Sequence, residues 1–94
     1  MVEIIWTQAA LKDLHSIFLF ISADSVFYAT RFSTRLMNRV EILKAYPFSG
    51  RVVPEKEDKT IRELIEGNYR IFYFVKTDST IFILRIHHSS KKII

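Results

Sequence analysis

The sequence contains no cysteine and only two glycines and two prolines. Without cysteine, the chain has no means of forming a disulfide or a thiolate metal site. No apolar run reaches the roughly 18 residues that a membrane-spanning helix needs. The first six residues lack the positively charged start and the small-residue cleavage site of a signal peptide. We therefore expect a cytoplasmic protein that does not enter the membrane.

Charge and apolar content are both high for so short a chain. The 94 residues are enough for one domain, which we take as residues 1–94, and their formal net charge is +4 with 49% hydrophobic residues. Nine of the 14 basic residues lie in the second half of the chain. Basic charge favours a polyanion or an acidic partner. A domain this small buries only ~60–65% of its unfolded surface, so some apolar groups stay exposed or meet a partner.

The first half of the chain predicts a short strand and two helices. The strand covers residues 2–6, and Thr7 follows it as an N-cap for a helix over residues 8–22, whose apolar residues recur at helical spacing. Asp24 or Ser25 can begin a second helix, which Pro47 ends because proline disfavours helix in the residue before it. Two helices joined by so short a break predict an αα-hairpin.

The second half predicts a sheet. A short edge strand falls at residues 51–54, a charged loop at 55–59, and longer strands at 60–65, 69–75 and 80–88. Gly67-Asn68 suits a tight hairpin turn, and residues 76–79 form another turn. The two last strands are apolar on both faces. Because the helices cover only one face, we expect the other face to be the partner surface, unless the tail from Ser89 covers it.

Charged side chains gather in these strands and in the segment before them. They are Arg51, Glu55, Lys56, Lys59, Arg62, Arg70, Arg85 and His87. RNA can be cut without a metal if a base takes the 2′-OH proton, guanidinium groups stabilise the phosphate and an acid protonates the leaving oxygen. In such a site His87 would be the acid or base. Arg62 and Arg70 would clamp the phosphate, and Glu55 would be a second base or a positioning group.

A structural role accounts for the same residues about equally well, with Arg62 and Arg70 paired to Glu63, Glu55 or a partner protein. Other kinds of site are disfavoured. His87 and His88 point to opposite sheet faces, so they do not indicate a metal site. Two isolated glycines make no phosphate-binding loop, and no nucleophile elbow is present. The aromatic run at 69–74 is better explained by core packing than by base stacking.

The order of these elements resembles the RelE/ParE toxin superfamily over nearly the whole chain. The matching residues fall in three groups. They are Trp6, Ala9-Ala10, Asp13-Leu14 and Ile17; then Pro47, Gly50-Arg51 and Val53-Pro54-Glu55; then Ile61-Arg62-Glu63-Leu64, Asn68-Tyr69-Arg70-Ile71, Tyr73 and Ile83 to His87. The resemblance implies an α+β fold of order β-α-α-β-β-β, with a helical hairpin packed on a small antiparallel sheet. It also implies a cognate antitoxin that wraps the toxin, with operator DNA bound only through the toxin–antitoxin complex.

The superfamily divides by mechanism, since ParE-like members inhibit DNA gyrase and RelE-like members cut mRNA on the ribosome. Glu55, Arg62, Arg70 and His87 match nuclease positions in some RelE-like relatives, but His88 stands where some of those have tyrosine. The helical hairpin and the Pro-x-x-Gly-Arg segment look more ParE-like, so we expect a gyrase inhibitor without cofactor or metal. An mRNA endoribonuclease and an inert, degenerate toxin are the alternatives. The residues expected to meet the target or a phosphate are Arg51, Lys59, Arg85, His88, Lys91 and Lys92.

Overall fold

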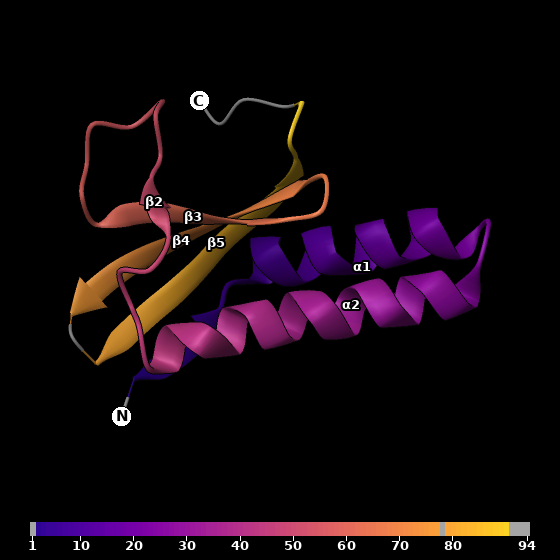
Figure 1. Ribbon diagram of the computed structural model, residues 1–94, viewed down its shortest axis with the longest axis horizontal. Helices are drawn as coiled ribbons and strands as arrows, with labels where there is room; N and C mark the ends of the chain where they lie inside the picture. The colour runs from indigo at the N-terminus through magenta and orange to yellow at the C-terminus, as the bar shows by residue number, and fades with distance from the viewer. Residues whose placement is uncertain (1, 78, 91–94) are drawn as a thin grey trace.

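The protein has two layers, a twisted sheet and a helical hairpin that covers one of its faces (Figure 1). The computed structural model describes residues 2–77 and 79–90. In chain order the elements are β1 (Glu3–Trp6), α1 (Gln8–Ser22), α2 (Val26–Glu41), a 3-10 turn η1 (Ile42–Lys44), β2 (Arg51–Val52), β3 (Ile61–Glu66), β4 (Tyr69–Thr77) and β5 (Thr80–His88). This order confirms the predicted α+β fold.

Both helices begin at the predicted caps. The Thr7 hydroxyl accepts a hydrogen bond from the Ala10 N–H, and the Ser25 hydroxyl accepts one from the Tyr28 N–H. The first helix has the predicted bounds. The second does not continue to Pro47, because α2 ends at Glu41 and its last turn tightens into η1, a common ending for a helix. Neither helix is both long and apolar enough to cross a membrane, and nor is any other helix in the described part of the chain.

In the part of the chain that the structure describes, the sheet has five strands in the order β1-β5-β4-β3-β2. All neighbours are antiparallel except β1 and β5, which run parallel, so the predicted antiparallel sheet is in fact mixed. A parallel pair needs a long connection, and here the helical hairpin and the other three strands provide it. Lys76 and Thr77, which were predicted to lie in the turn at 76–79, belong instead to the end of β4.

Alternate residues of each strand face the helices and form the core. From β4 these are Ile71, Tyr73 and Val75, which pack with Leu36 and Val40 of α2. The opposite side of the sheet is called the far face below. Its centre is not the open surface that the sequence predicts, because Phe72 is 0% exposed, Glu63 1% and Arg70 6%. Farther along the same face Phe74 and Phe82 stack on each other and stay partly exposed.

Candidate functional site

A network of ion pairs occupies the centre of the far face. Glu63, in the middle of β3, accepts hydrogen bonds from Arg51 Nε at 2.6 Å and from Arg70 Nε at 2.5 Å. Glu63 has two cross-strand neighbours, Arg51 on β2 and Phe72 on β4. Arg70 lies two residues before Phe72 on β4 and therefore on the same face of the sheet. The side-chain alternation of three adjacent strands therefore brings these groups together.

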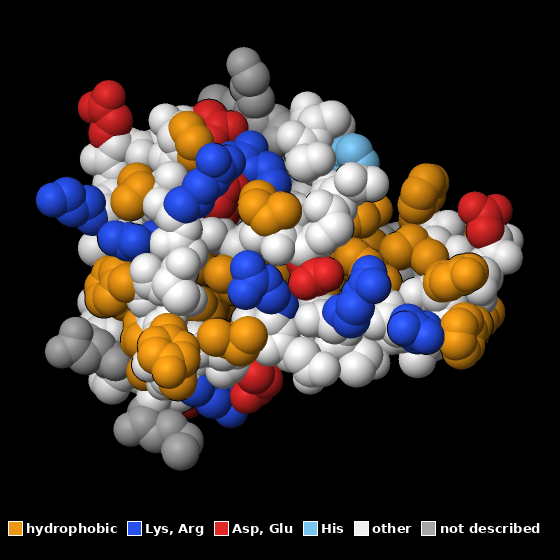
Figure 2. All heavy atoms as spheres, viewed as in Figure 1, with side chains coloured by type: hydrophobic (Ala, Val, Ile, Leu, Met, Phe, Trp, Pro, Cys, Tyr) orange, Lys and Arg blue, Asp and Glu red, His pale blue; other side chains and the backbone are white. Residues whose placement is uncertain are grey.

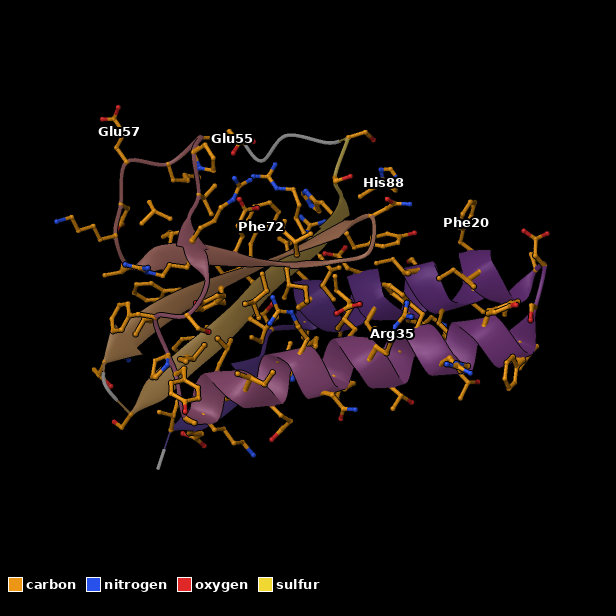
Figure 3. All side chains as sticks on the ribbon, in the orientation of Figure 1. Phe20, Arg35, Glu55, Glu57, Phe72 and His88 are labelled. Atoms are coloured by element: carbon orange, nitrogen blue, oxygen red, sulfur yellow. The ribbon has the colours of Figure 1, made fainter. Side chains whose placement is uncertain are left out.

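Glu55 completes this network from the loop that follows β2. Its carboxylate oxygens accept hydrogen bonds from both terminal nitrogens of Arg70, from Nη1 at 2.9 Å and from Nη2 at 2.8 Å. Such a bidentate pair is the strongest geometry that arginine makes with a carboxylate. Arg51, Glu55, Glu63 and Arg70 are called the Glu63 network. Figure 3 shows Glu55 and Phe72 on the side of the sheet away from the helices.

Opposite charges stabilise the Glu63 network. Two guanidinium groups meet two carboxylates, so the formal charges cancel. The hydrogen bond to Glu55, and then that to Glu63, raises the pKa of Arg70 above its ordinary value against the lowering effect of burial. A charge as buried as that of Glu63 is tolerated only because two guanidinium groups compensate it. The network thereby ties β2, the following loop, β3 and β4 together.

His87 lies beside this network. It is the cross-strand neighbour of Arg70 on β5, and its ring meets the Phe72 ring edge-on with centroids 5.6 Å apart. The Arg70 guanidinium carbon lies 4.7 Å from the centroid of the same Phe72 ring. The far face thus gathers three of the four residues predicted for a nuclease, namely His87, Arg70 and Glu55. A hollow of about 390 Å³ opens beside them, lined in part by Arg51, Glu55 and Arg70.

Arg62, the fourth predicted nuclease residue, lies on the other face. Its cross-strand neighbour is Tyr73, whose ring belongs to the core on the helix side. Its guanidinium donates to the main-chain oxygens of Lys59 at 2.9 Å, Gly50 at 3.0 Å and Phe48 at 3.2 Å. The sheet separates Arg62 from Arg70, so the predicted phosphate clamp of these two residues is not assembled. Arg62 instead holds the segments on either side of β2.

Arg85, predicted to meet a target, has a partner within the chain. Its Nε and Nη2 donate to the two oxygens of Asp13 on α1, at 2.8 and 3.1 Å. The Asp13 hydrogen bond raises the pKa of Arg85. Burial raises the pKa of Asp13, but hydrogen bonds from Arg85 and the Ile86 N–H lower it more, so it lies below its ordinary value. No pattern in the sequence predicts this pair, which joins a helix to a strand.

The structure describes two of the remaining predicted target residues, His88 and Lys59, and neither belongs to the Glu63 network. His88 points to the face opposite His87, as predicted, and its ring meets that of Tyr69. Lys59 is exposed in the loop before β3. Lys91 and Lys92 lie outside the described residues. Among residues 2–77 and 79–90, no three His, Asp or Glu side chains come together as metal ligands.

Comparisons with known proteins agree in one family. Residues 4–93 match the sequence profile described as "ParE toxin of type II toxin-antitoxin system, parDE". The Caulobacter vibrioides protein "Toxin RelE2" is 35% identical over 92 residues, which cover 97% of this chain and 99% of that protein. A solved structure, "Chromosomal ParDE TA system from P. aeruginosa", is similar with a TM-score of 0.75 and 25% identity, covering 94% of this chain and 96% of that one. The chain therefore belongs to the ParE family of toxins of type II toxin–antitoxin systems, a membership that implies an antitoxin partner.

Proposed function

We propose that this toxin arrests growth by binding and inhibiting DNA gyrase, and that it does not cut RNA. The main observation in support of this proposal is the bidentate pairing of Arg70 with Glu55. A nuclease of the kind considered above needs guanidinium donors aimed at the phosphate in the transition state. Here both terminal nitrogens of Arg70 already point at a carboxylate.

Opening this pair for a phosphate would be costly. A phosphate approaching Arg70 would have to displace Glu55 or meet its negative charge, and the second arginine of a clamp is missing because Arg62 lies across the sheet. The network is better suited to holding the fold in one shape. A binding protein benefits from such rigidity, because less freedom is lost when it meets its target.

The alternative is a ribosome-dependent mRNA endoribonuclease. One observation favours it: His87, Arg70 and Glu55 share one face, which places an acid or base next to a cation. The name of the similar protein "Toxin RelE2" points in the same direction. In this mechanism Glu55 would release Arg70 when RNA binds, and His87 would exchange a proton with the reacting oxygens.

One experiment separates the two mechanisms. The toxin is expressed from a tight promoter, and plasmid supercoiling and RNA 5′ ends are followed in the same cells within minutes. His87→Ala is compared with His15→Ala, a matched control because His15 is exposed on α1. Circular dichroism of each purified variant, taken with its antitoxin, verifies that it folds.

For a gyrase inhibitor we expect relaxed plasmids, unchanged mRNA ends and undiminished arrest by both variants. New ends at ribosome-occupied codons, with normal supercoiling and with arrest lost only in His87→Ala, would refute the proposal and establish the nuclease. Absence of any growth defect would contradict both mechanisms and leave an inert toxin.

A further inference from the structure

Along α2 a pair of residue types repeats every four positions. Each pair has an uncharged polar residue followed by an arginine, and the three pairs are Thr30-Arg31, Thr34-Arg35 and Asn38-Arg39. Residues four apart lie on the same side of a helix. The three arginines therefore form one row along α2, called the arginine row below, and the polar residues form a second row beside it.

The arginine row lies at the surface, along the border of the side of α2 that packs on the sheet. The residue that follows each arginine is buried, and these residues are Phe32, Leu36 and Val40. Arg31 and Arg35 are exposed, and Arg39 is partly exposed. In Figure 2, basic side chains follow one another along the helical hairpin on the face toward the viewer. A partner that approaches this face meets the guanidinium groups directly.

Little negative charge lies close to the arginine row. The one carboxylate of α2 belongs to its last residue, Glu41, and pairs with Lys44 at 2.8 Å. Among the described residues, the carboxylate that reaches the row is that of Glu66 at the end of β3, at 3.6 Å from Arg35 and 3.9 Å from Arg39. Three guanidinium groups thus meet one carboxylate, so the row keeps a net positive charge that attracts an anionic partner.

The spacing of the arginine row suits a chain of phosphates. Successive arginines are four residues apart, or about 6 Å along the helix axis, and neighbouring phosphates on one strand of a nucleic acid are separated by a similar distance. The planar guanidinium group binds two phosphate oxygens with parallel hydrogen bonds. The hydroxyl of Thr34 and the side-chain amide of Asn38, both exposed beside the row, can donate to the same phosphates.

The composition of this surface indicates a duplex rather than a single strand. Proteins that bind single strands add aromatic rings on which the bases stack. The exposed rings of α2, Phe27 and Tyr28, lie in its first turn before the row, and residues 33–41 contain no aromatic side chain. A surface that contacts only phosphates does not read the bases, so its binding should not depend on base sequence.

We propose that the arginine row binds the phosphate backbone of duplex DNA, independently of base sequence. The choice of duplex DNA over duplex RNA rests on the proposed function, because gyrase acts on duplex DNA. A toxin that contacts both the enzyme and its DNA dissociates from them more slowly than one that contacts the enzyme alone, since two linked contacts raise the overall affinity. The arginine row thus adds a DNA contact to the contact with gyrase.

Direct DNA binding tests this proposal. The probes are short labelled DNA duplexes of two unrelated sequences, together with a duplex RNA and a single DNA strand. Their binding to the toxin, separated from its antitoxin, is followed by fluorescence anisotropy at a series of salt concentrations. Arg31→Gln/Arg35→Gln removes two charges from the row, and Lys12→Gln/Lys76→Gln removes two from exposed sites outside α2. Circular dichroism verifies that each variant folds.

We expect the toxin to bind both DNA duplexes equally. The arginine double variant should bind them about tenfold more weakly, and its affinity should depend less on salt, with a slope smaller by about two because each phosphate contact contributes about one. The lysine double variant should stay within about threefold of wild type.

Equal weakening by the two double variants would overturn the proposal, because only net charge would then matter. Tighter binding of the RNA duplex or of the single strand would also overturn it. So would a toxin that binds no DNA, and loss of growth arrest in the arginine variant of such a toxin would assign the row to an acidic protein surface. The anisotropy assay contains no gyrase, so failure of this proposal and failure of the gyrase proposal are distinguishable.

Discussion

Asp13 and Arg85 lie 72 positions apart and join the helical hairpin to the sheet. The Asp13 carboxylate accepts two hydrogen bonds from the Arg85 guanidinium and a third, at 2.8 Å, from the Ile86 N–H. Within the described residues, β1 pairs with residues 80–83 of β5, and β5 continues beyond this pairing as a sheet edge. Asp13 occupies that edge and satisfies a backbone donor that a sixth strand would otherwise bond.

Asp13→Asn should therefore destabilise the protein, and the loss should depend on pH. We expect about 1 kcal/mol near neutral pH, since Arg85 is half exposed and water screens the pair. The pKa of Asp13 lies below its unfolded value, so its charge contributes stability above pH ~4, and that contribution is lost as pH falls through the lowered pKa.

Urea unfolding at a series of pH values measures how the free energy of unfolding of wild type and of Asp13→Asn depends on pH. The difference between wild type and variant should close below pH ~4, and a difference that stays constant with pH would contradict the assignment. Asp24→Asn, in the exposed turn between the helices, is the control.

Glu63 should be far harder to replace than Glu55, although both pair with Arg70. Glu63→Ala leaves Arg70 and Arg51 without their common acceptor, inside a face where Arg70 is buried. We expect a loss of about 3–5 kcal/mol, the usual effect of removing one partner of a buried ion pair. Glu55→Ala removes a more exposed carboxylate and leaves Arg70 paired with Glu63, so it should cost less, about 2 kcal/mol. Chemical unfolding compares the two variants, and equal losses would mean that Glu63 is not the centre of the network.

Local signals in the sequence predicted most of the fold. The caps at Thr7 and Ser25, the helical spacing of apolar residues and the Gly67-Asn68 turn all act over a few residues, and each is found where it was expected. The parallel pairing of β1 with β5 could not be found in this way. This pairing brings together the first and the last strand of the chain, and no short sequence pattern predicts a contact over that separation.

The candidate site was predicted only in part, and the misplacement of Arg62 has a clear reason. A two-residue turn at Gly67-Asn68 pairs Glu66 with Tyr69, and this register pairs Arg70 with Ile65. Arg62 is three residues from Ile65, an odd number, so it must point to the opposite face from Arg70. The information was present in the sequence, but only once the register was counted from the turn. The Asp13–Arg85 pair had no such signal, because it depends on where α1 docks.

Gly50 should not tolerate a side chain. Its N–H donates to the Tyr73 hydroxyl at 2.9 Å, and a Cβ here would lie 2.5 Å from the Glu63 main-chain oxygen and 2.6 Å from that hydroxyl. Gly50→Ala must therefore displace either β3 or Tyr73, at a cost of about 1–3 kcal/mol. The neighbouring Ser49→Ala, at an exposed position, serves as the control. Thermal unfolding of both variants measures the effect, and a stable Gly50→Ala protein would show that the segment before β2 can shift.

Arg62→Lys separates the structural role of Arg62 from a role in phosphate binding. Lysine keeps the positive charge but lacks the planar fork that reaches three main-chain oxygens. We expect a loss of about 1–2 kcal/mol and faster hydrogen exchange in the segments that this fork joins, residues 47–60, with toxicity per folded molecule unchanged. Lys56→Arg, in the loop before β3, is the matched control for exchanging the two cations. If Arg62 served to clamp a phosphate, Arg62→Lys would instead lower toxicity while exchange in this segment stayed slow. Hydrogen exchange and growth arrest, measured on the same variant, therefore decide which role Arg62 has.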